Sequence, residues 1–241
     1  MKSALAGVLA LAAFFGVPFS AGAQDKAEDQ GISSPLLSRC AGKFGARLRA
    51  GDEAFPLLAL SGVPWMTVEH TNQKVNGAHI VDVVTGIGVR NRRRGEVVGL
   101  RYRCLIDDKG EVVDFTWSDL LPERNEALPP AMLLRGTAYY QPKTQLAPGA
   151  ELRVQLFDKA QDPPALLTEA VIRSSWVEPI PFGLRLPPDM KLEGRKLVID
   201  ARLSMGQVTL YRLKMPLPLA VDQLQRPIHL VIMQVAGNAV Y

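Results

Sequence analysis

The second half of the chain is divided into short apolar-rich runs, and this division constrains the fold more than any other feature of the sequence. Seven runs lie between residues 132 and 235, separated by turns that contain Pro, Gly or Asp. None has the length and periodicity of an amphipathic helix, and a series of short strands is typical of a β-sandwich. The predicted strands are Met132–Tyr140, Glu151–Asp158, Ala165–Ser174, Ile180–Leu186, Lys196–Leu203, Val208–Lys214 and Ile228–Val235.

The first half begins with a predicted helix. Ser34 precedes Pro35, a favoured pair for the cap and first turn of a helix. Apolar residues then recur at helical spacing up to about Arg49, so one face of the helix is expected to be buried. The residues on this face are Leu36, Leu37, Cys40, Phe44 and Leu48.

Three antiparallel strands are predicted after the helix, at His79–Arg90, Glu96–Ile106 and Glu111–Trp117. In the middle strand Cys104 alternates with Arg101 and Arg103, so the cysteine is expected on one face and the two arginines on the other. The first half is therefore predicted to be a helix packed on an antiparallel meander. Residues 52–76 give no firm prediction.

The first 23 residues have the layout of a secretory signal peptide. Lys2 precedes an apolar run from Leu5 to Phe19, and the small residues after it predict cleavage after Ala23. A membrane anchor is the alternative, but a helix of this length rises only about 22 Å, against roughly 30 Å of hydrocarbon. The chain is therefore expected to be periplasmic and not membrane-spanning, with a mobile leader at residues 24–33.

The sequence contains two cysteines, Cys40 and Cys104. In an oxidising compartment two cysteines usually pair, whereas two free thiols would be expected in the cytosol. Cys40 is placed on the apolar face of the helix and Cys104 on the inner face of the meander by separate arguments. A structural disulfide between them is predicted.

The segment before the second half contains Pro122, Pro129 and Pro130 among polar residues, which indicates a linker. The predicted organisation is a signal peptide (1–23), a leader (24–33), an α+β domain (34–121), a linker (122–131) and an all-β sandwich domain (132–241).

No catalytic constellation is visible in the sequence. The three histidines, His70, His79 and His229, do not share ligand spacing, so neither a metal site nor a cofactor is predicted. A Gly-x-Ser-x-Gly nucleophile elbow is also lacking. The protein is expected not to be an enzyme, and an envelope hydrolase is the least favoured function because no nucleophile is paired with a base.

A cluster of arginines is the sharpest local feature. It is a candidate site for phosphate or carboxylate polymers such as lipopolysaccharide, or for an acidic protein surface. The alternative is a charged strand edge that discourages pairing with other strands. Nucleic acid is not an expected partner in an exported compartment. The cluster consists of Arg90, Arg92, Arg93, Arg94, Arg101 and Arg103.

A family resemblance rests on four segments of the second half. These are Arg135–Tyr139, Leu146–Asp158, Pro179–Leu184 and Lys196–Leu203 with the following Gly206. Residues 134–235 resemble the YbaY/YscW family of small envelope proteins, which includes type III secretion pilot lipoproteins. This resemblance implies a β-sandwich that binds or escorts another envelope component, such as a secretin. Unlike the lipoproteins, this chain has no cysteine near the predicted cleavage site, and its additional N-terminal domain is not assigned to a family.

The expected function is a non-enzymatic binding or chaperone-like role in the periplasm. The partner would be an envelope protein, such as an outer-membrane or secretion component, captured as an extended segment at a sheet edge or groove. The alternative is a binder of glycans or anionic lipid head groups that uses the basic hairpin from Arg90 to Arg103.

Overall fold

The computed structural model describes residues 35–50, 57–91, 96–141, 146, 149–174 and 178–236. The predicted signal peptide, its cleavage site after Ala23, the leader and the arginines at 92–94 lie outside these residues. All described elements belong to one unit, which spans residues 31–241.

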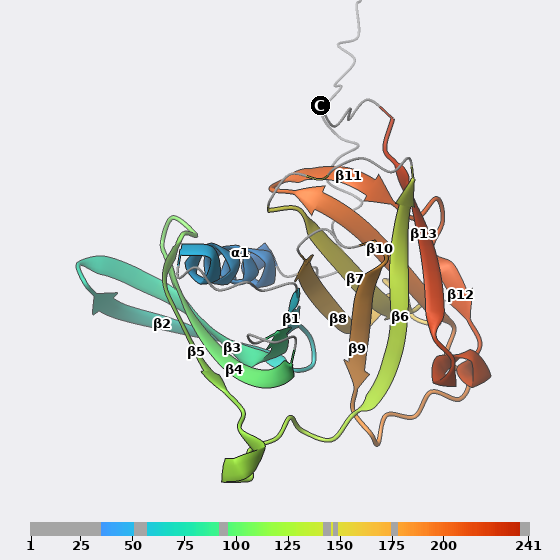
Figure 1. The fold of residues 1–241 in the computed structure, drawn as a ribbon, viewed down its shortest axis with the longest axis horizontal. Helices are drawn as coiled ribbons and strands as arrows, with labels where there is room; N and C mark the ends of the chain where they lie inside the picture. The colour runs from blue at the N-terminus through green and yellow to red at the C-terminus, as the bar shows by residue number, and fades with distance from the viewer. Residues whose placement is uncertain are drawn as a thin grey trace, which may run out of the picture. The chain divides into compact units, whose positions relative to one another are not determined.

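The described chain is mostly β-structure with one N-terminal α-helix (Figure 1). The predicted helix and the ten predicted strands are confirmed, with ends within two residues of those observed. Strands β1, β2 and β12 were not predicted. The elements are α1 (Pro35–Ala50), β1 (Leu57–Ser61), β2 (Met66–Val75), β3 (Ala78–Asn91), β4 (Val97–Asp107), β5 (Val112–Asp119), η1 (Pro122–Arg124), β6 (Met132–Gln141), β7 (Glu151–Asp158), β8 (Ala165–Ser174), β9 (Ile180–Leu186), β10 (Leu197–Met205), β11 (Val208–Arg212), β12 (Leu217–Leu219), η2 (Val221–Gln225) and β13 (Ile228–Gln234).

All thirteen strands form one hydrogen-bonded sheet, in the order β5-β4-β3-β1-β8-β7-β10-β11-β13-β6-β9. Strand β2 pairs with β3 and β12 pairs with β10, off this path. Strand β1 joins the two halves of the sheet, because it pairs with β3 on one side and with β8 on the other. A separate sandwich domain is therefore not confirmed, and the division into domains remains a prediction.

Strands β6 to β13 curve around a large apolar core (Figure 1). The core-facing residues alternate with exposed ones along β6, β9 and β13, as period-two strands require. The prolines and glycines between the strands end each run, which explains why the sequence predicted these strands well.

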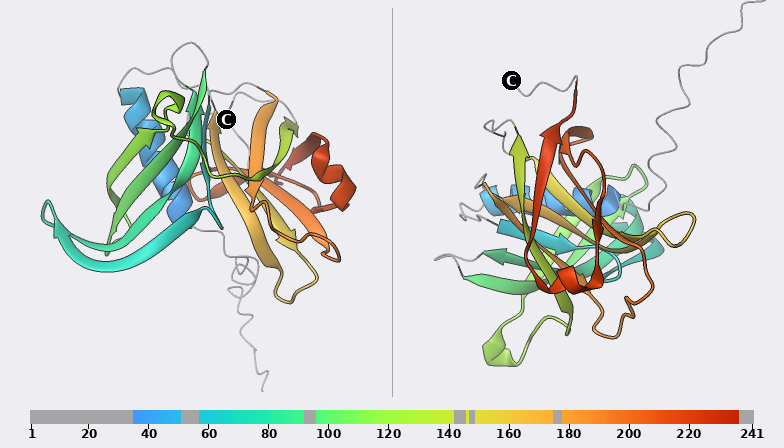
Figure 2. Two further views of the ribbon diagram at one scale, coloured as in Figure 1. Left: turned by 90° about the horizontal axis from the view of Figure 1, so that it is seen from below. Right: turned by 90° about the vertical axis from the view of Figure 1, so that its right-hand side faces the viewer.

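Helix α1 lies against one face of the β3–β5 sheet, as both views in Figure 2 show. The predicted disulfide is confirmed: Cys40 on α1 is bonded to Cys104 on β4, and both residues are fully buried. Beside the disulfide, the ring of Phe44 lies 4.6 Å from that of Phe115 and 4.5 Å from that of Trp117, measured between centroids. The apolar stripe that predicted the helix is thus the face that packs on the sheet.

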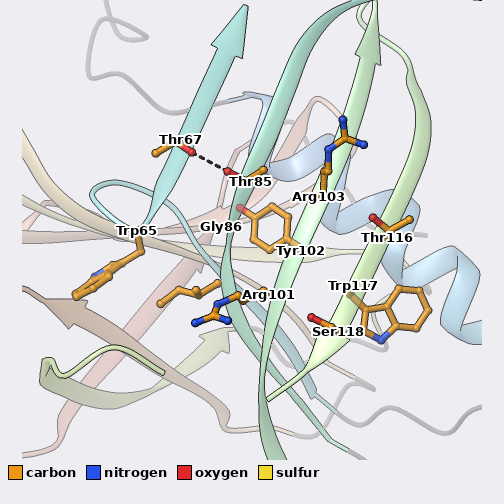
Figure 3. Close-up of a pocket in the computed structure, with 11 residues that line it drawn as sticks. Trp65, Thr67, Thr85, Gly86, Arg101, Tyr102, Arg103, Thr116, Trp117 and Ser118 are labelled. Carbon is orange, nitrogen blue, oxygen red and sulfur yellow. Dashed lines mark hydrogen bonds between the residues drawn. The ribbon is translucent and has the colours of Figure 1, made fainter. Parts of the chain in front are cut away.

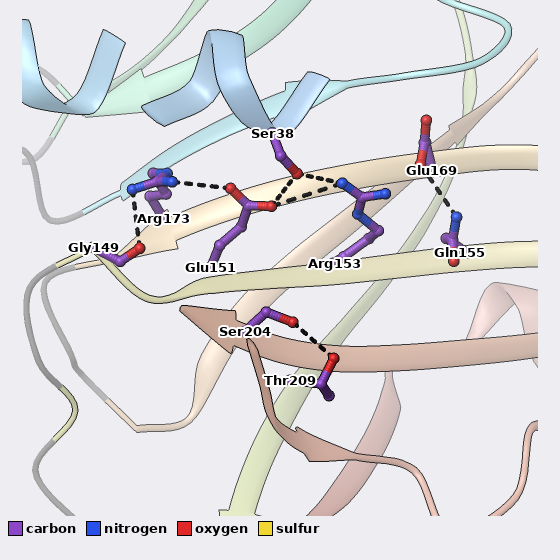
Figure 4. Close-up of polar contacts among 9 residues, drawn as sticks. All are labelled: Ser38, Gly149, Glu151, Arg153, Gln155, Glu169, Arg173, Ser204 and Thr209. Carbon is purple, nitrogen blue, oxygen red and sulfur yellow. Dashed lines mark hydrogen bonds and ion pairs between the residues drawn. The ribbon is translucent and has the colours of Figure 1, made fainter. Parts of the chain in front are cut away.

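Polar contacts connect α1 to the second half of the sheet (Figure 4). Glu151 on β7 forms an ion pair with Arg173 on β8 at 3.1 Å and lies 3.8 Å from Arg153. Ser38 on α1 donates a hydrogen bond to Glu151 and accepts one from Arg153. All three charged side chains are largely buried, so helix and sheet are joined by charge as well as by apolar packing.

Asp158 ends strand β7 and is almost fully buried. Its carboxylate accepts hydrogen bonds from the backbone N–H of Ala160 (2.9 Å) and of Lys196 (3.1 Å), and from Arg195 (3.0 Å). These hydrogen bonds, first the one from Ala160, hold the pKa of Asp158 below its ordinary value despite burial. The carboxylate therefore stabilises the folded state when it is ionised.

Changing Asp158 to Asn is expected to lower the free energy of unfolding by about 1–2 kcal/mol at pH 7. Because the folded-state pKa lies below the unfolded one, this contribution is complete above the unfolded pKa and is lost as the pH falls through the folded pKa. Urea unfolding between pH 7 and pH 3 should therefore show the two proteins converging in acid. The exposed Asp189→Asn variant is the control, and an equal effect of both substitutions would contradict the assignment.

Candidate functional site

The predicted arginine cluster is divided by the structure. Arg90 on β3 is buried, and its guanidinium donates two hydrogen bonds to Asp119 on β5, at 2.9 and 2.8 Å. Arg101 and Arg103 on β4 are exposed and lie on the face opposite Cys104, as the alternation predicted. Arg90 thus has a structural ion pair, while Arg101 and Arg103 remain available on the surface.

Arg101 and Arg103 line a groove on the face of the β2–β5 sheet turned away from α1 (Figure 3). The groove has a volume of about 510 Å³. Cross-strand pairing explains how its lining comes together, because Thr85 and Thr116 are the ladder partners of Arg103 on either side, and Ser118 is a partner of Arg101. The lining residues are Trp65, Thr67, Thr85, Gly86, Ile87, Arg101, Tyr102, Arg103, Thr116, Trp117 and Ser118. We call this feature the arginine groove.

Trp65 stands at one end of the arginine groove and is held by strand β9. Its indole N–H donates to the backbone carbonyl of Arg185 at 2.7 Å, and the Arg185 guanidinium lies 5.5 Å from the ring centroid. Trp65 and Thr67 fall in residues 52–76, a segment without a firm prediction. Their contribution could not be found from the sequence, because β2 is exposed along most of its length and lacks apolar alternation.

Tyr102 reaches the groove lining from the opposite, buried side of β4. Burial and, to a smaller extent, the charge of Glu169 raise the pKa of its hydroxyl far above the ordinary value for tyrosine. Tyr102 therefore stays neutral at any physiological pH. The positive charge of the groove comes from Arg101 and Arg103.

The three histidines lie in separate places in the described structure. His70 is hydrogen-bonded to Asp82 at 2.6 Å, His79 to Asn72, and His229 to the hydroxyl of Thr137 at 2.8 Å. Among the described residues, no three His, Cys, Asp or Glu side chains are grouped so that they could hold a metal ion. Each histidine is therefore accounted for by a local polar contact.

At each end of the sheet path, a backbone carbonyl accepts a hydrogen bond from a side chain of the same protein. At β5, Arg47 from α1 donates to the backbone carbonyl of Phe115 at 2.5 Å. At β9, the carbonyl of Arg185 accepts from the Thr168 hydroxyl at 2.8 Å as well as from Trp65. A carbonyl that is occupied in this way is not available to pair with a further strand at that position.

Strand β13 lies within the order of the sheet but is paired incompletely. It pairs with β6 over Ile228–Met233, but the ladder to β11 is limited to two residues at its end, Met233 and Gln234. Within the described residues, Ile228–Ile232 therefore have a ladder partner on one side only. Five large exposed apolar side chains lie on this strand or in the segment of chain that precedes it, namely Met215, Leu217, Val221, Val231 and Met233. We call these five residues the β12–β13 apolar surface.

Comparison with known proteins gives one family and one solved structure. Residues 129–226 match the model of a family described as type III secretion system lipoprotein chaperone (YscW). No curated protein matches the chain. The solved structure is described as an alternative pilotin from the type II secretion system of Vibrio cholerae. It is 15% identical, the match covers 44% of this chain and 97% of that one, and the TM-score of 0.39 is too low to establish a shared fold.

None of the helices in the described part of the chain has both the length and the apolar character needed to cross a bilayer. The family match begins just before β6 and ends just after η2, so it includes Met215, Leu217 and Val221 of the β12–β13 apolar surface. The resemblance drawn from the motifs between Arg135 and Gly206 is thereby confirmed as a match of residues 129–226 to the YscW family model.

Proposed function

We propose that this protein is a non-enzymatic, chaperone-like protein of the cell envelope that binds a component of a secretion system. The observation that carries the proposal is the match of residues 129–226 to a family described as a secretion chaperone. The N-terminal sequence pattern and the buried disulfide support a periplasmic location, because structural disulfides persist in oxidising compartments.

The β12–β13 apolar surface is the proposed binding surface. Met215 has 74% of its surface exposed and Val231 has 46%. Five of the eight large exposed apolar side chains among the described residues fall between residues 215 and 233. The pairing of Arg212 with Met233 brings the chain before β12 next to the end of β13. Exposed apolar side chains that gather in this way typically mark a surface covered by a partner.

An extended segment of the partner fits this surface best. The backbone of Ile228–Ile232 has ladder pairs only on the β6 side, so main-chain hydrogen bonds can form on the other side. Apolar side chains of the segment would then contact Val231 and Met233. At β5 and at β9, by comparison, a backbone carbonyl is already occupied by a side chain of the same protein.

The proposed surface is tested with a double variant, Met215→Gln and Val231→Thr, which removes apolar contacts but keeps side-chain size. Loss of about 1 kcal/mol at each position predicts affinity about 10- to 30-fold weaker for the partner. The matched control is Val97→Thr with Val208→Thr, two exposed valines outside the surface. Both variants should keep the melting temperature of the wild type.

The partner is first identified by cross-linking the full-length protein in envelope extract, followed by mass spectrometry. The affinity of the purified partner is then measured for the wild type, the double variant and the control variant. A secretion component that binds the wild type and the control variant, but binds the double variant weakly, is the expected result. If no secretion component is enriched, the proposed function is wrong; if the double variant binds as tightly as the wild type, only the surface is wrong.

A further inference from the structure

The arginine groove has the charge of an anion site. Arg101 and Arg103 line it, and no Asp or Glu is among its lining residues. Neither guanidinium group forms a hydrogen bond or an ion pair with any residue that the structure describes. By contrast, Arg90 is bound by Asp119 and Arg47 lies 3.7 Å from Asp114. The two groove arginines are therefore free to bind a ligand that carries negative charge.

The spacing of the arginines points to two anionic groups rather than one. Arg101 and Arg103 are two residues apart on one strand, so their backbones are separated by about 6.6 Å. Figure 3 shows their guanidinium groups pointing in different directions, with Arg101 turned to the side on which Trp65 lies. Each guanidinium can form a bidentate contact with one phosphate or carboxylate.

The groove between and around the arginines is lined by hydroxyl groups and by an indole. Thr67 and Thr85 share a hydrogen bond of 2.7 Å, and Thr116 and Ser118 add two further hydroxyls from β5. Hydroxyls both donate and accept, which suits the hydroxyls of a sugar. The fixed ring of Trp65 gives an apolar contact beside a polar edge. The arginine groove, with a volume of about 510 Å³, is within the size range of small-molecule sites.

Recognition in this groove must rely on side chains. Strand β3 pairs with β4 on one side and with β2 and β1 on the other, and β4 pairs with β5 as well as β3. The backbone groups of the groove floor are therefore used within the sheet, and a peptide could not be added here as a further strand. This favours a charged saccharide over an acidic peptide.

We propose that the arginine groove binds a phosphorylated saccharide, with Arg101 and Arg103 each contacting a phosphate and the Thr and Ser hydroxyls contacting the sugar. The inference does not rest on the proposed chaperone role, because the groove lies on β2–β5, outside the segment that matches the YscW family. Arg90 has no part in it, since Asp119 holds its guanidinium.

The test uses the full chain and two probes: a glucosamine disaccharide with a phosphate at each end, free in solution, and vesicles that contain the same head group as a glycolipid. Vesicles of phosphatidylglycerol with equal surface charge provide phosphate without sugar. Calorimetry and vesicle flotation should show binding to the glycolipid vesicles, weaker binding to phosphatidylglycerol, and a decrease in affinity with rising salt. Binding of the soluble disaccharide as well would show that the saccharide alone is sufficient, and binding to vesicles only would place the ligand at a membrane; both support the proposal.

The Arg101→Ser/Arg103→Ser variant is expected to bind about 100-fold more weakly, at about tenfold for each arginine. A variant with the same change in net charge, Lys109→Ser/Lys191→Ser, alters exposed lysines outside the groove and should stay within about twofold of the wild type. Because both arginines are exposed, the melting temperature of the double variant should not change. Equal binding to glycolipid and phosphatidylglycerol, equal weakening by both variants, or binding of an acidic peptide in place of the saccharide would overturn the proposal.

Discussion

Changing Cys40 and Cys104 to alanine is expected to lower the free energy of unfolding by about 2–4 kcal/mol. The disulfide closes a loop with a sequence separation of 64 residues, for which the chain-entropy model gives about 4 kcal/mol as an upper figure. Alanine is chosen because both positions are fully buried, and a serine hydroxyl there would add a desolvation cost. A loss of this size is a large share of a typical domain stability of about 5–15 kcal/mol.

Guanidinium unfolding of the double variant measures the effect, and the wild type treated with a thiol reductant provides an independent comparison. Both should unfold at a lower denaturant concentration than the oxidised protein. The two cysteines are the only ones in the chain, so no other bond changes on reduction. Coincident unfolding curves for oxidised and reduced protein would show that the bond stabilises nothing.

Changing Glu151 to Gln is expected to lower the free energy of unfolding by about 3 kcal/mol. Arg173 and Arg153 both lie beside its carboxylate, and all three side chains are at most 14% exposed. Removal of the negative charge would take the ion-pair partner at Glu151 away from the buried guanidinium of Arg173 and one carboxylate away from Arg153. Breaking a buried pair costs about 3–5 kcal/mol. Because some solvent reaches Arg173, the expected loss of unfolding free energy lies at the lower end of this range.

Urea unfolding of Glu151→Gln, with the exposed Glu193→Gln as the matched control, checks this expectation. The control should lie within about 0.5 kcal/mol of the wild type. Because Ser38 on α1 also bonds to Glu151, hydrogen exchange in α1 should increase in the variant. A variant as stable as its control would mean that the buried charges are solvated in some other way.

The sequence predicted most elements from local patterns, namely helical periodicity in α1 and alternation in strands such as β9. Strands β7, β8 and β9 begin and end at the predicted residues, where Pro- and Gly-containing turns interrupt the apolar runs. The meeting of Cys40 and Cys104 was also predictable, because helical and strand periodicity each place one cysteine on a buried face. Local patterns of this kind require no knowledge of which strands are neighbours.

The features that were not predicted from the sequence depend on which strands are neighbours in the sheet. Strand β1 is buried between β3 and β8, so its Leu-rich run has no simple alternation, and β2 is too polar to resemble a strand. Arg90 on β3 and Asp119 on β5 lie on either side of β4, so their ion pair can be expected only when the order of these three strands in the sheet is known. Only part of the arginine groove could be predicted. The alternation of β4 placed Arg101 and Arg103 on one face, but no prediction placed Trp65 and Thr67 beside them.

The position of β1 has a consequence for work with fragments. Along Ala170–Ser174, strand β8 is hydrogen-bonded to β1, which comes from far earlier in the chain. A truncated protein that started at residue 129 would keep the whole family segment yet lose this strand, uncovering Val171 and a row of unsatisfied amides. Such a fragment would self-associate through the unpaired edge of β8. Self-association of the fragment would then reflect the missing strand β1 and not a binding function of the full-length protein.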